Sequence, residues 1–238
     1  MTLATQRKGA LVLGALGIGL TLLFHYMVFF TVSTEATLGI VQRIFYVHVP
    51  SAWVAFLAFG IVALSGAVYL WIGDERLDQI GRAAAEGGLA FTTIVLLTGP
   101  LWARLSWGTW WTWEPRLTFT LLLWFIYVGY FMVRNATASP EQGRRYAAVV
   151  GIVGALNIPL IHVSVIWFRS LHPEPVVLNA AEGPSLPGDM LATLMIALAA
   201  WTALFFSFFL LRYSVLKLEA REEERSGSSV SGQGLAVR

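Results

Sequence analysis

The chain contains no cysteine, which excludes disulfide bonds, thiolate metal sites, iron–sulfur clusters and thiol relay chemistry. Any metal ion that it holds must be bound by His, Glu or Asp. Its only lysines are Lys8 and Lys217, and it has no G-x-x-x-x-G-K-[ST] motif, so it does not hydrolyse ATP. Its net charge of +2 is small and its basic residues are dispersed, which argues against nucleic acid as a partner.

Charged residues are scarce, at 13% of the chain, whereas hydrophobic residues make up 57% and the mean hydropathy is +0.68. Several uncharged runs of about 20 residues are each long enough to cross roughly 30 Å of hydrocarbon. We therefore expect an all-α, polytopic membrane protein with six transmembrane helices. The predicted spans lie near residues 9–32, 50–72, 87–103, 117–133, 146–168 and 190–211.

The distribution of basic residues predicts that the N-terminus and the C-terminus are both cytoplasmic, because basic loops are retained there. Twelve Lys and Arg residues fall on the side of the termini, and only Arg43, Arg104, Arg116 and Arg169 fall on the other. Residues 1–216 are predicted to form one six-helix transmembrane domain. Residues 217–238 are charged, then rich in Gly and Ser, and are predicted to form a partly disordered cytoplasmic tail.

Tryptophan is concentrated between the third and fourth predicted spans, where the run WARLSWGTWWTW holds five of the ten tryptophans. An aromatic belt at a membrane interface is the simpler interpretation, but a belt usually supplies only one or two per helix end. We interpret the run as a flat apolar surface for a planar ligand. Helical spacing would put Trp107, Trp110 and Trp111 on one face, although Gly108 and Pro115 argue against a continuous helix.

Two histidines lie on the same predicted outer side as the tryptophans. His48, in RIFYVHVPSAW, comes just before the second span, and His172, in IWFRSLHPEP, follows the fifth. Neutral imidazole is a good axial ligand of haem iron, and two imidazoles can close both faces of one iron. The four arginines on this side are available to pair with the two haem propionates.

His25 and His162 are competing ligand candidates, because they lie in the outer thirds of the first and fifth spans. Asn157 and Pro159 are expected to kink the helix that carries His162, which would let that side chain face a cavity. His48 and His172 rank first, since they flank loops that can reach around a disc-shaped ligand.

Three segments, WGTWWTWEPRLT, RIFYVHVPSAW and SVIWFRSLH, resemble haem-handling proteins with a WWD signature. Together they resemble the cytochrome c maturation family CcmC, the haem exporter proteins C, over most of the six-helix region. The resemblance implies a non-covalent haem b with bis-His iron. Its ligands would be His48 and His172, and its surroundings would include Trp107, Trp110, Trp111, Trp113, Glu114 and Arg116. The family's signature usually carries Asp where this chain has Glu114, which is one methylene longer.

The resemblance also implies a function. The chain would bind haem at the outer, periplasmic face of a bacterial inner membrane and deliver it to the haem chaperone CcmE, without acting as an enzyme. CcmD and the transporter subunits CcmA and CcmB would be its other partners.

Three other functions make different predictions. A transmembrane haem permease subunit of an ABC transporter needs polar groups along its spans, and these spans are nearly bare. A b-type electron-transfer cytochrome needs His ligands deep in facing helices. A structural assembly subunit would hold no cofactor.

Overall fold

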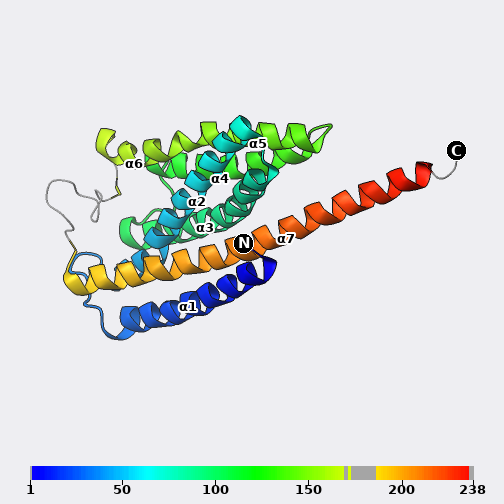
Figure 1. The fold of residues 1–238 in the computed structure, drawn as a ribbon. Helices are drawn as coiled ribbons and strands as arrows, with labels where there is room; N and C mark the ends of the chain where they lie inside the picture. The colour runs from blue at the N-terminus through cyan, green and yellow to red at the C-terminus, as the bar shows by residue number, and fades with distance from the viewer. Residues whose placement is uncertain (1, 169–170, 173–185, 236–238) are drawn as a thin grey trace.

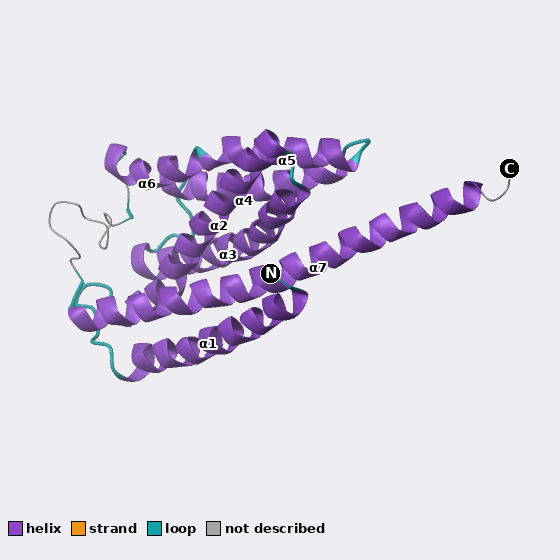
Figure 2. Cartoon of the chain, viewed as in Figure 1, coloured by secondary structure: helices purple, strands orange, loops and turns teal. Residues whose placement is uncertain are grey.

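The computed structural model describes residues 2–168, 171–172 and 186–235. Figure 2 shows that this described part consists of helices joined by loops, with no strand. The α-helices are α1 (Leu3–Phe30), α2 (Phe45–Ile72), α3 (Glu75–Trp107), α4 (Pro115–Asn135), α5 (Pro140–Ala155), α6 (Asn157–Trp167) and α7 (Gly188–Leu235), and a 3-10 helix, η1 (Ile40–Ile44), precedes α2. The predicted all-helical fold is confirmed.

Six helical segments are long and apolar enough to cross a membrane, as the sequence predicted. They are Leu3–Phe30, Ile40–Ile72, Glu75–Trp107, Pro115–Asn135, Pro140–Trp167 and Gly188–Glu223. Most are longer than the uncharged runs, because the helices continue through polar residues until a capping signal ends them. For example, α3 begins well before its apolar run, at the N-cap residue Asp74, whose side chain accepts a hydrogen bond from the backbone N–H of Arg76.

The fifth span is two helices rather than one. α5 ends at Ala155 and α6 begins at Asn157. Pro159 has no N–H group to donate to the carbonyl of Ala155, so the helix cannot continue regularly through this point. The buried side chain of Asn157 donates from Nδ2 to the carbonyl oxygen of Phe119 in α4, at 2.8 Å. The predicted interruption near Asn157 and Pro159 is confirmed.

The helices form two groups that meet at α7. α1 packs along α7, while α2 to α6 form the remainder of the bundle and contact α7 through α2 and α3 (Figure 1). The larger hydrophobic core receives residues from each helix from α2 to α7, and includes Val54, Phe59, Leu123, Tyr127 and Phe205. A second core joins α1, the start of α2 and the start of α7. The long last helix then continues past the other helices toward the C-terminus (Figure 1).

Gly88 allows the closest approach within the larger core. A Cβ atom added there would lie 2.0 Å from the hydroxyl oxygen of Tyr127, so only glycine leaves room for this buried ring. The Tyr127 hydroxyl donates to the carbonyl oxygen of Ala55 at 2.9 Å. This contact ties α4 to α2 across α3 and fixes the relative positions of the three helices.

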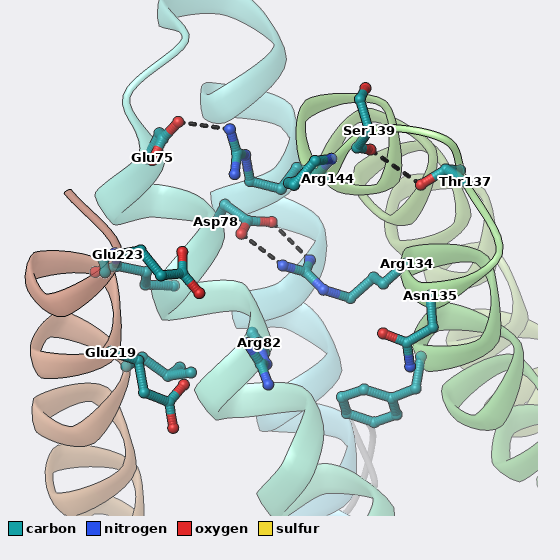
Figure 3. Close-up of a pocket in the computed structure, with 15 residues that line it drawn as sticks. Glu75, Asp78, Arg82, Arg134, Asn135, Thr137, Ser139, Arg144, Glu219 and Glu223 are labelled. Carbon is teal, nitrogen blue, oxygen red and sulfur yellow. Dashed lines mark hydrogen bonds and ion pairs between the residues drawn. The ribbon is translucent and has the colours of Figure 1, made fainter. Parts of the chain in front are cut away.

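A charged cavity of about 370 Å³ lies at the end of the bundle where α3 begins and α4 ends. Figure 3 shows its side chains, which come from α3, from α4 and the following turn, from α5, and from the extension of α7. Arg134 donates to both carboxylate oxygens of Asp78 at 2.6 Å, and Arg144 pairs with Glu75 at 2.5 Å. This end is the predicted cytoplasmic end, and the orientation in the membrane stays a prediction.

Candidate functional site

The predicted site residues come together at the opposite end of the bundle. His48 lies in the first turn of α2, Trp107 is the last residue of α3, and Glu114 is the N-cap residue of α4. His172 follows α6, whose end lies on the same side of the bundle as the end of α3 (Figure 1). The sequence placed His48 just before its helix. The structure corrects this, because η1 and α2 extend the second span toward the N-terminus to include it.

The tryptophan run is divided between a helix and a loop. α3 ends after Trp107 at Gly108, whose φ of 75° lies in the left-handed region that favours glycine. The residues from Thr109 to Trp113 are not helical, and Pro115 starts α4. Trp107 therefore does not share a continuous helical face with Trp110 and Trp111. The break in the helix that Gly108 and Pro115 predicted is confirmed.

The tryptophans of the loop leave a large part of their apolar surface uncovered. The exposed fraction is 58% for Trp110 and 76% for Trp113, while Trp111 is half-buried. Trp111 and Trp113 pack edge to face, with ring centroids 5.8 Å apart and an interplanar angle of 79°. The loop thus presents two exposed indoles supported by a third.

Glu114 holds the segment that carries His172. One carboxylate oxygen of Glu114 contacts Nδ1 of His172, and the other accepts a hydrogen bond from the backbone N–H of Leu171 at 3.0 Å. Only 8% of the Glu114 side chain and 19% of the His172 side chain are exposed. The edge of His172 also packs against Trp107, with ring centroids 5.2 Å apart. The side chain of Glu114 makes no capping hydrogen bond to α4, and it instead positions the residues that follow α6.

The contact with Glu114 decides which nitrogen of His172 carries the hydrogen. An ionised carboxylate can only accept hydrogen bonds, so Nδ1 of the imidazole must carry the hydrogen. Burial and the positive charge of Arg116 lower the pKa of His172, while the hydrogen bond and charge of Glu114 partly oppose this shift. A lowered pKa favours the neutral ring at neutral pH, and with the hydrogen on Nδ1 the lone pair of that ring lies on Nε2.

His48 has polar and aromatic contacts with α3. Its Nδ1 lies 2.9 Å from Oγ1 of Thr98, and its ring packs edge to face against Trp102, with centroids 5.6 Å apart. Thr98 was not among the predicted site residues, and Trp102 was predicted only as the first tryptophan of the run and not as a neighbour of His48. The available signal was their spacing of four residues, which puts a polar and an aromatic side chain on one face of an apolar helix.

Arg116 is a described arginine whose charge acts on both histidines. It lies within electrostatic range of both His48 and His172, and these two histidines lie within range of each other. Arg43 instead lies over the ring of Phe29, 5.9 Å from its centroid, and Arg104 donates to the carbonyl of Gly108 at the end of its own helix. The fourth arginine of this side, Arg169, lies outside the described residues.

The competing histidines point elsewhere. His25 uses Nδ1 to bond the carbonyl oxygen of Thr21, at 2.8 Å, in its own helix, and its ring packs on Phe24. His162 has an exposed side chain on α6. The predicted kink before His162 is therefore present, but it does not direct this side chain into a cavity.

Several buried polar atoms of the site have no hydrogen-bond partner in the part of the chain that the structure describes. They are Nε1 of Trp102, Oγ of Ser106, Nε1 of Trp111 and Oγ1 of Thr112. Unpaired buried polar atoms are rare in native proteins and point to a missing water molecule, ion or ligand. All four lie between the last turns of α3 and the start of α4.

Comparisons with known proteins identify the family of this chain. Residues 2–227 match the family model CcmC, described as Heme exporter protein C. The chain is 36% identical to Heme exporter protein C of Bradyrhizobium diazoefficiens, covering 77% of this chain and 70% of the relative. It is 34% identical to Heme exporter protein C of Haemophilus influenzae, covering 75% of this chain and 73% of the relative. It is 32% identical to a putative cytochrome c biosynthesis ccmC-like mitochondrial protein of Marchantia polymorpha, covering 81% of each protein. The chain belongs to the CcmC family of haem exporter proteins, multi-pass membrane proteins that take part in haem export for cytochrome c biogenesis.

Proposed function

We propose that this chain binds one haem between His48 and His172, beside the tryptophan loop, and passes it to a separate haem chaperone. One observation carries the proposal. Two imidazoles lie within electrostatic range of each other, and each has Nδ1 hydrogen-bonded to the protein and an indole at its edge. The relatives' name, Heme exporter protein C, supports haem as the ligand. The chain is then a holding and transfer site rather than an enzyme.

His48 and His172 are the proposed axial ligands of a non-covalently bound haem b. A neutral imidazole with a hydrogen-bonded Nδ1 is the usual form of a metal-ligating histidine, because the second contact fixes the ring and raises its basicity. The chain has no cysteine, so it cannot anchor haem through thioether bonds. Two His–iron bonds and burial of the ring provide affinity, and displacement of one imidazole by a partner releases the haem.

The tryptophan loop is the proposed surface for the porphyrin ring. The exposed indoles of Trp110 and Trp113 offer apolar area to a flat ligand, and Trp107 and Trp111 complete the surface behind them. The unpaired donors of Trp111 and Thr112 and the guanidinium of Arg116 are suited to carboxylates, which a haem supplies as propionates.

The proposed location is the periplasmic face of a bacterial inner membrane. The basic residues concentrate at the opposite end of the bundle, which supports cytoplasmic termini and an outward-facing site. The chaperone CcmE is the proposed acceptor of the haem, and CcmD, CcmA and CcmB are the proposed partners in the membrane. The chain lacks an ATP-binding motif of its own, which agrees with a separate ATPase subunit.

Purification from haem-replete cells tests the proposal. The wild-type protein is expected to carry haem with the Soret band and low-spin spectrum of bis-His iron. His48→Ala and His172→Ala should each lose most of this haem, because either change removes an axial ligand.

His25→Ala and His162→Ala are the matched controls, since both histidines lie in spans of the same protein without contacting the site. Each should retain wild-type haem. A folded but colourless wild-type protein, or normal haem in both His48→Ala and His172→Ala, would overturn the proposal.

A further inference from the structure

The hydroxyl group of Thr98 connects His48 to the backbone of α3. Its Oγ1 lies 2.9 Å from Nδ1 of His48 and 2.7 Å from the carbonyl oxygen of Ile94, with a longer contact of 3.4 Å to the carbonyl oxygen of Val95. A threonine hydroxyl has a single hydrogen. Two oxygen atoms as close as 2.7 Å repel each other unless that hydrogen lies between them. The hydrogen therefore points to Ile94, and Thr98 presents a lone pair to His48.

A ring nitrogen that faces a lone pair must be the donor, so Nδ1 of His48 carries a hydrogen. In a neutral imidazole the lone pair then lies on Nε2. We infer that Thr98 is a positioning residue, which fixes His48 in the tautomer that presents Nε2 to the haem iron. This inference rests on the proposed function. It assigns to Thr98 the same role toward His48 that Glu114 has toward His172.

The neighbours of Thr98 hold the imidazole in place. A Cβ atom added at Gly99 would lie 3.3 Å from Cε1 of His48, so the ring is packed directly against the backbone of α3. Trp102 covers the ring one turn further along, at an interplanar angle of 70°. Packing therefore limits rotation of the ring, and the hydroxyl of Thr98 decides which of its nitrogens is free.

Thr92 is the control for Thr98, because it makes the same hydrogen bond within α3 but has no described histidine to position. Its Oγ1 donates to the carbonyl oxygen of Gly88 at 2.7 Å, as Thr98 does to Ile94, and it is also on α3. Thr92 is buried in the bundle, and no contact with a histidine is found for it among the described residues. Replacing either threonine by valine keeps the shape and removes the hydroxyl.

The experiment compares Thr98→Val, Thr98→Ser, Thr92→Val and His48→Ala in the full-length chain loaded with haem. Haem affinity is measured by titration, and the fraction of six-coordinate low-spin iron by absorption and electron paramagnetic resonance. Changing the hydrogen-bond partner of a ligating histidine typically weakens metal affinity about 10- to 100-fold. We expect a loss of this size and a high-spin signal in Thr98→Val, and wild-type behaviour in Thr98→Ser and Thr92→Val.

Wild-type affinity and spectrum in Thr98→Val, beside a defective His48→Ala, would overturn this inference alone. Wild-type haem in His48→Ala would overturn the proposed function as well.

A second measurement does not depend on any valine variant. Nitrogen-15 NMR of the haem-free wild-type chain, labelled at its four histidines, reports the tautomer of each ring. The signal that is lost in His48→Gln is the signal of His48. A protonated Nδ1 with a bare Nε2 is expected, and the opposite tautomer would overturn the inference.

Discussion

The carboxylate of Glu114 is in hydrogen-bonding contact with the imidazole of His172, 58 positions later in the chain. The signature that this chain resembles usually has the shorter Asp at this position. Here the longer side chain reaches both Nδ1 of His172 and the backbone N–H of Leu171. Glu114 therefore acts on the proposed haem through the loop that it holds, and its negative charge makes the imidazole of His172 more basic.

Glu114→Gln is expected to weaken haem binding roughly tenfold and to raise the reduction potential of the bound haem. The amide replaces one of the two accepting carboxylate oxygens by an NH2 group, which can only donate, so the contact with His172 or the one with Leu171 is lost. A less basic imidazole also stabilises ferric iron less. Glu114→Asp should lie closer to the wild type in potential, because it keeps the charge. Haem titration and a spectroscopic redox titration measure the two effects.

Glu35→Gln is the control for this change, because Glu35 is a loop carboxylate that accepts hydrogen bonds from the backbone N–H groups of Thr37 and Leu38. It should leave both haem affinity and potential at wild-type values. An unchanged potential in Glu114→Gln would contradict the assigned contact with His172.

Trp110→Ala and Trp113→Ala are expected to weaken haem binding several-fold with little effect on folding. An aromatic contact of this kind contributes about 0.5–1.5 kcal/mol, and exposed side chains change stability by only about 0.5 kcal/mol when replaced. Haem titration together with thermal unfolding in detergent separates the two quantities. Trp71→Ala is the matched control, because Trp71 is exposed at the opposite end of α2. Haem affinity that fell equally in all three variants would argue against a binding surface on the loop.

The sequence was sufficient to predict the transmembrane helices, and it predicted that the candidate site residues would lie at one end of the bundle. A long uncharged run predicts a transmembrane helix whichever helices pack against it. Successive loops alternate between the two sides of the membrane, which predicts that His48, the tryptophans and His172 lie on one side. The exact helix limits were harder to predict. They depend on capping residues such as Asp74 and Gly108, which lie outside or at the edge of the apolar runs.

The contacts within the site could not be predicted from the sequence. Thr98 meets His48 only because α2 and α3 pack at one particular rotation, and that rotation is set by side chains far from the site, such as Tyr127 against Gly88. The partnership of Glu114 with His172 likewise depends on the path of the chain after α6. A polar residue in an apolar run identifies a candidate, but it does not identify the partner.

Asp78→Asn is expected to destabilise the protein by about 3–5 kcal/mol, because it leaves the largely buried guanidinium of Arg134 without its paired charge. Arg134 would keep its contact with the hydroxyl of Tyr130, 3.2 Å away, which does not replace a carboxylate. Thermal or denaturant unfolding in detergent measures the loss. The exposed pair of Glu141 and Arg145 offers the control, and Glu141→Gln should cost less than about 1 kcal/mol. Equal effects of the two changes would mean that burial adds nothing to the Arg134 pair.

Gly88→Ala is expected to destabilise the bundle by about 1–3 kcal/mol, which is the usual cost of overpacking a core. The added Cβ would lie 2.0 Å from the Tyr127 hydroxyl, so the ring must move and its 2.9 Å hydrogen bond to Ala55 is strained or lost. Gly60→Ala, in a part of α2 where an added Cβ meets nothing within 4 Å, should be neutral or slightly stabilising, since alanine favours helix more than glycine does. Because the packing of α2 on α3 also sets the Thr98–His48 contact, Gly88→Ala should reduce haem binding together with stability. A variant that lost stability but kept wild-type haem affinity would show that the packing at Gly88 does not set the contact between Thr98 and His48.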